Sequence, residues 1–166
     1  MSNRTILITG ASGGLGSVVV PYFLAREFRV IAVFSEENAK NKPEKHPLLD
    51  VQVVDLTDER AVGTLISWLI ETYQGIDAAL LLAGGYVAGG VADATGNEMK
   101  TMFAINFETA YYVVRPVYNH MNARGKGRIV LMGARPALEP SALKVSLPLL
   151  PSALLQLSAT ARPLAL

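Results

Sequence analysis

The sequence predicts an α/β fold in which a doubly wound parallel sheet carries helices on both faces. Three observations support this fold class. Short apolar runs typical of buried strands alternate with segments of helical periodicity between residues 5 and 131. A glycine-rich turn follows the first strand and opens a helix. The chain has 166 residues, of which 51% are hydrophobic and 17% charged, so it can bury one full core.

Five strands are expected, each as a short run rich in apolar residues. They cover residues 5–8, 29–34, 51–54, 78–82 and 127–131. The fourth run is apolar at every position, as expected for a strand that is covered on both faces. Because the strands alternate with helices, right-handed crossovers should place them parallel in one sheet.

Three helices are expected between these strands. The first should bury a stripe of apolar residues at helical spacing: Leu15, Val18, Val19 and Tyr22. The second is expected to be capped by Thr57 and to end at Gly75. Its buried face should hold the regularly spaced apolar residues Val62, Leu65, Ile66, Leu69 and Tyr73. The third should run from Asn97 to about Met121.

The chain is expected to divide at about residue 134. Residues 1–134 form the α/β domain, and residues 135–166 form a tail with five prolines, no glycine and one acidic residue. Within this tail only residues 151–160 predict a helix, with Pro151 able to occupy its first position.

Composition excludes several classes of function. A net charge of +1 gives no electrostatic argument for nucleic acid or for anionic membranes. The absence of cysteine excludes disulfides, thiolate metal sites and thiol nucleophiles. The uncharged run 145–161 contains two prolines and is shorter than a membrane-spanning helix. We expect a cytoplasmic protein with no metal site and with neither nucleic acid nor a membrane as partner.

A glycine-rich turn joins the first strand to the first helix. It reads Thr9-Gly10-Ala11-Ser12-Gly13-Gly14-Leu15-Gly16. Glycines in such a turn let the backbone bend sharply and let a phosphate group approach closely, while the N–H groups and the dipole of the helix attract the anion. The turn therefore predicts a site for the pyrophosphate of NAD or NADP, and the alternative is a glycine turn without a ligand.

With this turn, the chain resembles the short-chain dehydrogenase/reductase family, whose members are single-domain Rossmann oxidoreductases. The resemblance covers about residues 3 to 134. Gly13 and Gly14 together satisfy the T-G-x-x-x-G-x-G spacing of this family and the T-G-x-x-G-x-x-G spacing of its extended relatives. The resemblance implies a Rossmann fold and NAD or NADP as the cofactor. It also implies that the sheet is incomplete at its C-terminal end, because the family's sheet has two further strands that this chain does not reach.

Three later features favour the first of these spacings. Asp55-Leu56 follows the third strand, where the family's acidic residue meets the adenine amino group. Ala83-Gly84 ends the fourth strand, where the family usually shows N-N-A-G, although Leu81 and Leu82 replace the two asparagines. Asn106 lies inside the long helix, as the family's helical Asn does.

The resemblance implies a set of residues that contact the cofactor. They are Thr9, Gly10, Ser12, Gly13, Gly14, Leu15, Gly16, Ser35, Asp55, Leu56, Ala83, Gly84 and Gly85. Structural alternatives remain open: Asp55 as a helix-cap residue, Ala83-Gly84-Gly85 as an ordinary loop, and Asn106 as a buried amide without a catalytic part.

The choice between NAD and NADP depends on the end of the second strand. Phe34 stands roughly where the family's NAD-selecting Asp would be. Glu36 or Glu37 would repel a 2′-phosphate, whereas Ser35 with Lys40 or Lys42 would accept one. Both cofactors therefore stay open.

The catalytic residues of the family are missing, apart from Asn106. The family uses a Tyr in a Y-x-x-x-K motif as general acid/base, but no tyrosine follows Tyr118 in this chain. Aligning Ser152-Ala153-Leu154 with the residues after the family's Lys puts Leu147 and Pro151 at the Tyr and Lys positions. Gly133-Ala134 stands where the family has its Ser. This pair and the run 83–90 are similar to the dihydropteridine reductase branch of the family.

Three accounts of the function compete, in this order. The first is an oxidoreductase that transfers hydride on a carbonyl/alcohol pair, with a C-terminal part that is truncated or altered and an activity that is impaired. The second is a non-catalytic dinucleotide-binding or dimerisation module, and the third is an enzyme in which another residue does the chemistry. A small carbonyl or alcohol is the expected substrate.

A homo-oligomer through the 97–121 helix is also expected. The apolar residues that favour this contact are Met102, Phe103, Tyr111, Val114 and Val117. Burial of the same residues in the core explains them equally well.

Overall fold

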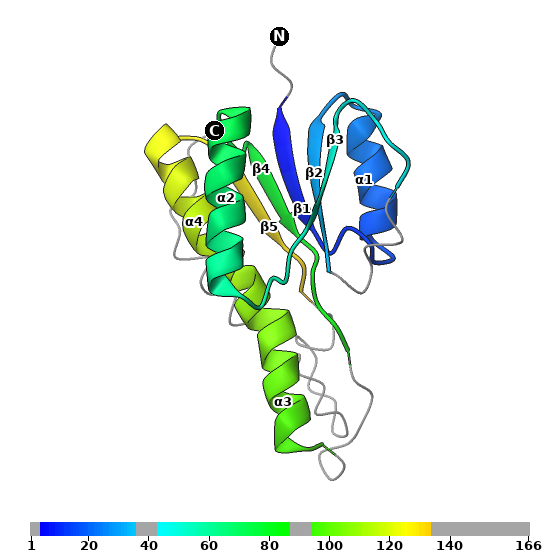
Figure 1. Ribbon diagram of the computed structural model, residues 1–166, viewed down its shortest axis with the longest axis vertical. Helices are drawn as coiled ribbons and strands as arrows, with labels where there is room; N and C mark the ends of the chain where they lie inside the picture. The colour runs from blue at the N-terminus through cyan, green and yellow to red at the C-terminus, as the bar shows by residue number, and fades with distance from the viewer. Residues whose placement is uncertain (1–3, 36–42, 87–93, 134–166) are drawn as a thin grey trace.

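The computed structural model describes residues 4–35, 43–86 and 94–133. In these ranges five parallel strands form one sheet in the order β3-β2-β1-β4-β5 (Figure 1). The strands are β1 (Thr5–Thr9), β2 (Arg29–Phe34), β3 (Leu49–Val53), β4 (Ala78–Leu81) and β5 (Arg128–Leu131). The predicted doubly wound parallel sheet is confirmed. The predicted boundary at residue 134 and the predicted helix 151–160 lie outside the described residues.

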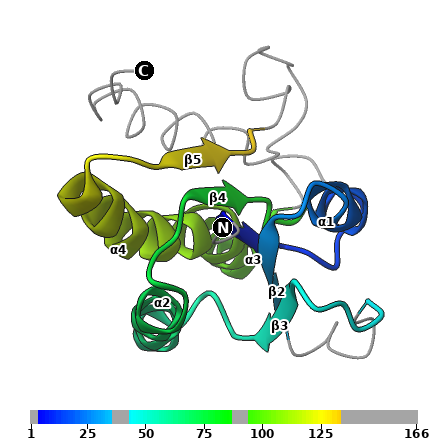
Figure 2. The ribbon, with the colours of Figure 1, turned by 90° about the horizontal axis from the view of Figure 1, so that it is seen from above.

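The helices cover both faces of this sheet. Helix α1 (Gly16–Leu24) lies on one face, and α2 (Glu59–Tyr73) lies on the other with α4 (Thr109–Arg124), as Figure 2 shows. Helix α3 (Gly96–Phe103) continues through the π-helix η2 (Ala104–Glu108) into α4, and it projects beyond the carboxyl ends of the strands (Figure 1). The strand order reverses between β1 and β4, so these two strands flank the switch point of the fold.

Two apolar clusters fill the space between the sheet and its helices. The cluster under α1 consists of Ile6, Ile8, Ala11, Val20, Val30, Ala32 and Phe34. The cluster under α2 and α4 includes Leu7 and Ile31 from the sheet. Side chains of β1 thus alternate between two covered faces, and every residue of this strand is buried.

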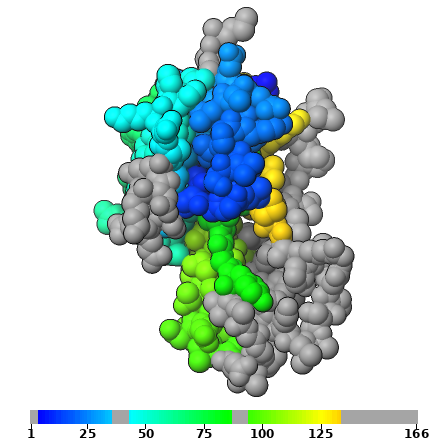
Figure 3. All heavy atoms as spheres, turned by 90° about the vertical axis from the view of Figure 1, so that its right-hand side faces the viewer, coloured from blue at the N-terminus to red at the C-terminus, as the bar shows by residue number. Residues whose placement is uncertain are grey.

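The buried face of α1 differs from the predicted one. Gly16 and Val20 are buried, whereas Leu15, Val18 and Tyr22 are 47%, 66% and 51% exposed. Figure 3 shows α1 on the surface of the molecule, in blue. A Cβ atom on Gly16 would lie 2.3 Å from the Gly10 carbonyl oxygen, so this glycine faces the turn and fixes the rotation of the helix. The predicted stripe is therefore wrong for Leu15, Val18 and Tyr22, because apolar residues occupy both sides of α1. Val19 is half-buried and packs against the cluster under α1, as predicted.

The N-cap of helix α2 lies one residue later than predicted. Asp58 is the N-cap, and its carboxylate accepts hydrogen bonds from the backbone N–H groups of Arg60 and Ala61, at 2.9 and 3.1 Å. Thr57 instead donates its N–H and hydroxyl to Asp55. The cap at Thr57 was therefore wrong, since the carboxylate of the next residue reaches these N–H groups. The predicted buried face is confirmed for Val62, Leu65, Ile66 and Leu69, while Tyr73 is half-buried.

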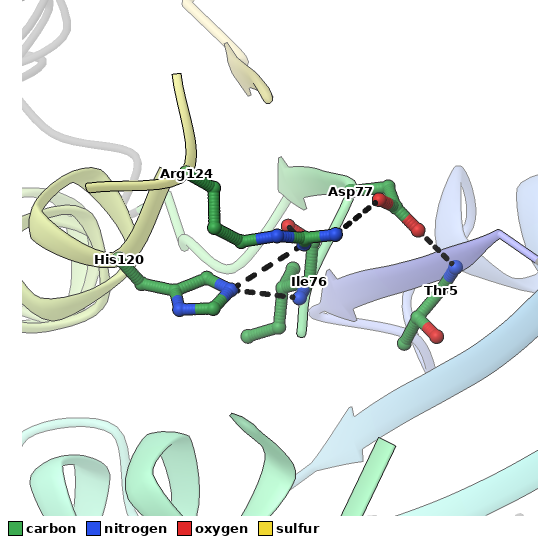
Figure 4. Close-up of polar contacts among 5 residues, drawn as sticks. All are labelled: Thr5, Ile76, Asp77, His120 and Arg124. Atoms are coloured by element: carbon green, nitrogen blue, oxygen red, sulfur yellow. Dashed lines mark hydrogen bonds and ion pairs between the residues drawn. The ribbon is translucent and has the colours of Figure 1, made fainter. Parts of the chain in front are cut away.

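A polar network at the amino ends of the strands ties α4 to the sheet (Figure 4). The Asp77 carboxylate accepts the Thr5 N–H at 2.9 Å and forms an ion pair with Arg124 at 3.4 Å. The Arg124 guanidinium also donates to the Ile76 carbonyl at 3.4 Å, while the His120 Nε2 accepts the Ile76 N–H at 3.3 Å. The imidazole must be neutral to accept this bond.

Acidification should weaken this attachment of α4. Burial, and then the neighbouring Arg124 charge, lower the pKa of His120, and Asp77 opposes them. Because the pKa is lower in the folded state, the unfolded state binds more protons as the pH falls below about 6.5. The stability from neutral His120 is therefore present above that pH and is lost as the pH falls towards the folded-state pKa. We expect urea unfolding to show a larger stability loss from about pH 7 to pH 5.5 in the wild type than in His120→Gln. Equal losses in the two proteins would contradict this role.

Candidate functional site

The candidate site lies where the carboxyl ends of β1 and β4 meet. The Thr9 hydroxyl accepts the backbone N–H groups of Leu82 and Ala83, at 3.2 and 3.3 Å. Gly10 has a φ of +64°, and a Cβ atom there would lie 2.7 Å from the Ala83 nitrogen. The glycine turn therefore packs directly against the loop after β4. Thr9, expected among the cofactor contacts, is buried and holds these two segments together.

Several backbone N–H groups in the glycine turn have no hydrogen-bond partner among the described residues. Gly13 donates its N–H to the Gly10 carbonyl at 3.0 Å, which closes the turn. The N–H groups of Ser12, Gly14 and Leu15 donate to no acceptor within residues 4–35, 43–86 and 94–133. They stand at the N-terminus of α1, where the helix dipole favours negative charge. The arrangement can hold an oxyanion.

The glycines of the turn differ in what the fold requires of them. Gly10 and Gly16 are needed because a Cβ atom would collide with backbone. A Cβ atom on Gly13 would lie 3.3 Å from the Gly10 carbonyl oxygen, a tight contact. A Cβ atom on Gly14 would meet nothing within 4 Å, and Gly14 lacks a positive φ. The fold alone therefore gives no reason for glycine at position 14.

The ends of β2 and β3 place three more of the expected residues at the same edge of the sheet. Ser35 is exposed just after β2, whereas Phe34 is packed in the cluster under α1. Asp55 is exposed after β3, and one of its carboxylate oxygens caps the Thr57 N–H and hydroxyl. The Leu56 side chain lies in the core beneath α2, so only its backbone is available to a ligand. The charged residues Glu36, Glu37, Lys40 and Lys42 lie outside the described residues.

Asn106 joins the long helix to the loop after β4. Its amide oxygen accepts the Gly85 N–H at 3.0 Å, and its amide nitrogen donates to the Met102 carbonyl at 3.1 Å. Asn106 lies in η2, and π-helical turns are frequent at functional sites. A Cβ atom on Gly84 would lie 2.8 Å from the Asn106 oxygen, so the two segments touch. The π-helix itself was not predicted, because helical periodicity does not reveal one extra residue in a turn.

No described tyrosine with a shifted pKa is suited to act as a base. Burial raises the pKa of Tyr73 to about 12, and its hydrogen bond to Asp50 adds to this effect. Burial and the charges of Glu108 and Glu59 raise the pKa of Tyr112. A phenol used as a base at neutral pH needs the opposite shift. Leu147 and Pro151, at the aligned Tyr and Lys positions, lie outside the described residues.

Across the described ranges, no group of three or more His, Asp or Glu side chains is placed to hold a metal ion. None of the helices described is long and apolar enough to cross a bilayer.

Comparison with known proteins decides the family. The family model described as short chain dehydrogenase matches residues 4–146. The chain belongs to this family. The predicted resemblance is therefore confirmed, and the match extends beyond residue 134, where the resemblance was expected to end. The narrower resemblance to the dihydropteridine reductase branch stays a prediction.

Two relatives of this short-chain dehydrogenase chain are longer than it is. Versicolorin reductase stcU of Emericella nidulans is 26% identical over 146 residues, which are 82% of this chain and 53% of that protein. An uncharacterized oxidoreductase of Schizosaccharomyces pombe is 31% identical over 127 residues, which are 76% of this chain and 43% of the relative. The chain therefore spans about half the length of these two relatives.

A solved structure agrees with the fold. The structure of ElxO with NADP bound superposes with a TM-score of 0.85 at 21% sequence identity, covering 93% of this chain and 65% of that one. This likeness supports the Rossmann architecture.

Proposed function

We propose that this chain is an NAD(P)-dependent oxidoreductase of the short-chain type, which transfers hydride on a carbonyl/alcohol pair, and that its activity is impaired in the chain as written. The observation that carries the proposal lies at the switch point of the sheet. There the backbone N–H groups of Ser12, Gly14 and Leu15 have no acceptor in the part of the chain that the structure describes. The domain that binds the cofactor is residues 1–134.

The residues at this edge of the sheet fit a dinucleotide. The turn from Gly10 to Gly16 would hold the pyrophosphate, and glycine at position 14 lets it approach the backbone. Ser35 would face the adenosine ribose, and Asp55 the adenine amino group, as in the family. Ala83-Gly84-Gly85 would line the middle of the cofactor. When bound, NAD or NADP supplies the hydride or accepts it.

The two positions aligned with the family's Tyr and Lys carry no group for its proton transfer. Neither Leu147 nor Pro151 carries a side chain that can move a proton or bind a ribose hydroxyl. The amide of Asn106 is already bonded on both sides, to Gly85 and Met102. These facts favour a second candidate function, a non-catalytic dinucleotide-binding module, in which Asn106 positions the loop after β4 rather than relaying protons.

Titration with NADH and NADPH, followed by nicotinamide fluorescence, tests the cofactor proposal. We expect at least one of the two cofactors to bind. The difference between the affinities for NADH and NADPH shows whether the site prefers a 2′-phosphate. Absence of binding by both at millimolar concentration would refute the pyrophosphate site. Turnover of generic carbonyl substrates at rates usual for such enzymes, on the order of 10 per second, would refute the impaired activity and the binding-only alternative.

We also propose that the protein forms a homo-oligomer and is located in the cytoplasm. A homo-oligomer through α3 and α4 is supported by Phe103 and Tyr111, which are 40% and 38% exposed and each stack on Phe107. Met102 and Val117 are buried, so they would not take part in such a contact. A cytoplasmic location is favoured by the lack of cysteine in the sequence.

A further inference from the structure

A cavity opens at the amino ends of the strands, at the opposite edge of the sheet from the glycine turn. Its volume is about 330 Å³. It is formed by the start of β1, the end of α2, the start of β4 and the segment that follows α4. The residues that line it are Arg4, Thr5, Tyr73, Gln74, Gly75, Asp77, Arg124 and Lys126.

Positive charge dominates this cavity. Three cationic side chains line it, from Arg4, Arg124 and Lys126, against the single carboxylate of Asp77. That carboxylate is already engaged by the Thr5 N–H and by Arg124. The Arg4 guanidinium lies 5.0 Å from the centre of the Phe28 ring and forms no ion pair with a described carboxylate. The lining therefore carries an excess of two positive charges.

Contacts with the described residues explain the position of Arg124 but not that of Lys126. Arg124 binds Asp77 and the Ile76 carbonyl, and its position in the last turn of α4 complements the helix dipole. The Lys126 ammonium makes no hydrogen bond or ion pair within residues 4–35, 43–86 and 94–133. Lys126 therefore lines the cavity with three donors unused by the described protein.

Thr5 gives an independent sign of a ligand. Thr5 is only 3% exposed, and it lines the same cavity. Its hydroxyl makes no hydrogen bond to any described residue. Figure 4 shows this hydroxyl turned away from Asp77, which binds only the Thr5 backbone. A buried hydroxyl without a partner costs free energy, so a bound group that accepts its hydrogen would relieve that cost.

We propose that this cavity binds the phosphate group of a small organic molecule. A phosphate offers several acceptor oxygens, which suit the compact charge of Lys126, the planar guanidinium of Arg4 and the Thr5 hydroxyl. The volume lies at the lower end of the range for ligand pockets, about 300–1,000 Å³, and leaves room for an organic group beyond the phosphate. This site does not depend on the proposed dinucleotide site, because the two lie at opposite edges of the sheet.

Phosphate titration observed by NMR tests the site. Inorganic phosphate and glycerol 3-phosphate would each be added to the ¹⁵N-labelled chain, with sodium chloride at matched ionic strength as the screening control. We expect shifts of the Gly75, Asp77 and Lys126 amides that chloride does not reproduce, with the ester binding at least as tightly as phosphate. The exposed Lys126→Gln should weaken binding about tenfold, whereas Lys100→Gln on α3 should leave it unchanged.

The same spectra separate this site from the glycine turn. Shifts confined to the Gly13–Gly16 amides, or equal shifts with chloride, would overturn the proposal. Unchanged phosphate affinity in Lys126→Gln would also overturn it, and binding of phosphate without binding of the ester would show that no organic group is accommodated. Because NADH and NADPH are absent from this experiment, a failure here leaves the dinucleotide proposal standing, and a failure of the cofactor titration leaves this one standing.

Discussion

Replacing Gly16 by Ala is expected to lower the free energy of unfolding by about 3 kcal/mol. The added Cβ atom would lie 2.3 Å from the Gly10 carbonyl oxygen and 2.6 Å from the Ala11 Cα atom. Both neighbours are backbone atoms, so neither can rotate away as a flexible side chain would. Helix α1 would have to move away from the turn, which would also disturb the packing of Val20 beneath it. Urea unfolding followed by circular dichroism measures this loss.

Gly63→Ala is the matched control for this substitution. Gly63 lies within α2, and a Cβ atom there would meet nothing within 4 Å. Alanine is preferred over glycine inside helices, so this variant should gain about 0.5–1 kcal/mol. If Gly16→Ala unfolds at the same urea concentration as the wild type, the close packing of the turn against α1 is wrong.

The sequence predicted the strands better than it predicted the helix surfaces. Each strand is a short apolar run between polar or glycine-rich segments, so all five were recognised within a residue or two of their ends. In α1, by contrast, Val18 and Val19 lie on adjacent positions, and periodicity alone could not decide which of them faces the sheet. The close contact between Gly16 and Gly10 decides it, and such a contact depends on three-dimensional packing.

The site was predicted at the level of its backbone, but less well for its side chains. Parallel strands bring their carboxyl ends to one edge, so the turn, Asp55 and Gly84 were expected to lie together there. The sequence could not show that the Leu56 side chain points into the core. Nor could it show that the buried Thr9 hydroxyl binds the backbone of the loop after β4. Both residues stand at positions where the family contacts its cofactor, and only the local rotation of the chain shows what their side chains touch.

Gly14→Val is expected to weaken dinucleotide binding about hundredfold, a change of about 2.8 kcal/mol, with almost no effect on folding. A side chain at position 14 would stand beside the unpartnered N–H groups and keep the pyrophosphate away from them. Nothing in the described protein lies within 4 Å of its Cβ position, and the backbone there lacks a positive φ. The free energy of unfolding should therefore change by no more than about 0.5 kcal/mol. Fluorescence titration with NADH and NADPH gives the affinity, and urea unfolding gives the stability.

Gly96→Val provides the comparison for this loss of binding. Gly96 is an exposed glycine at the start of α3 that also has nothing within 4 Å of a Cβ atom, and it lies outside the candidate site. The Gly96→Val variant should match the wild type both in its affinity for NADH and NADPH and in its free energy of unfolding. Unchanged affinity in Gly14→Val would mean that no phosphate approaches the turn closely, and the T-G-x-x-x-G-x-G spacing would then have no function here. A loss of stability equal to that of Gly16→Ala would instead show that glycine at position 14 serves the fold, because the ligand would no longer be needed to explain it.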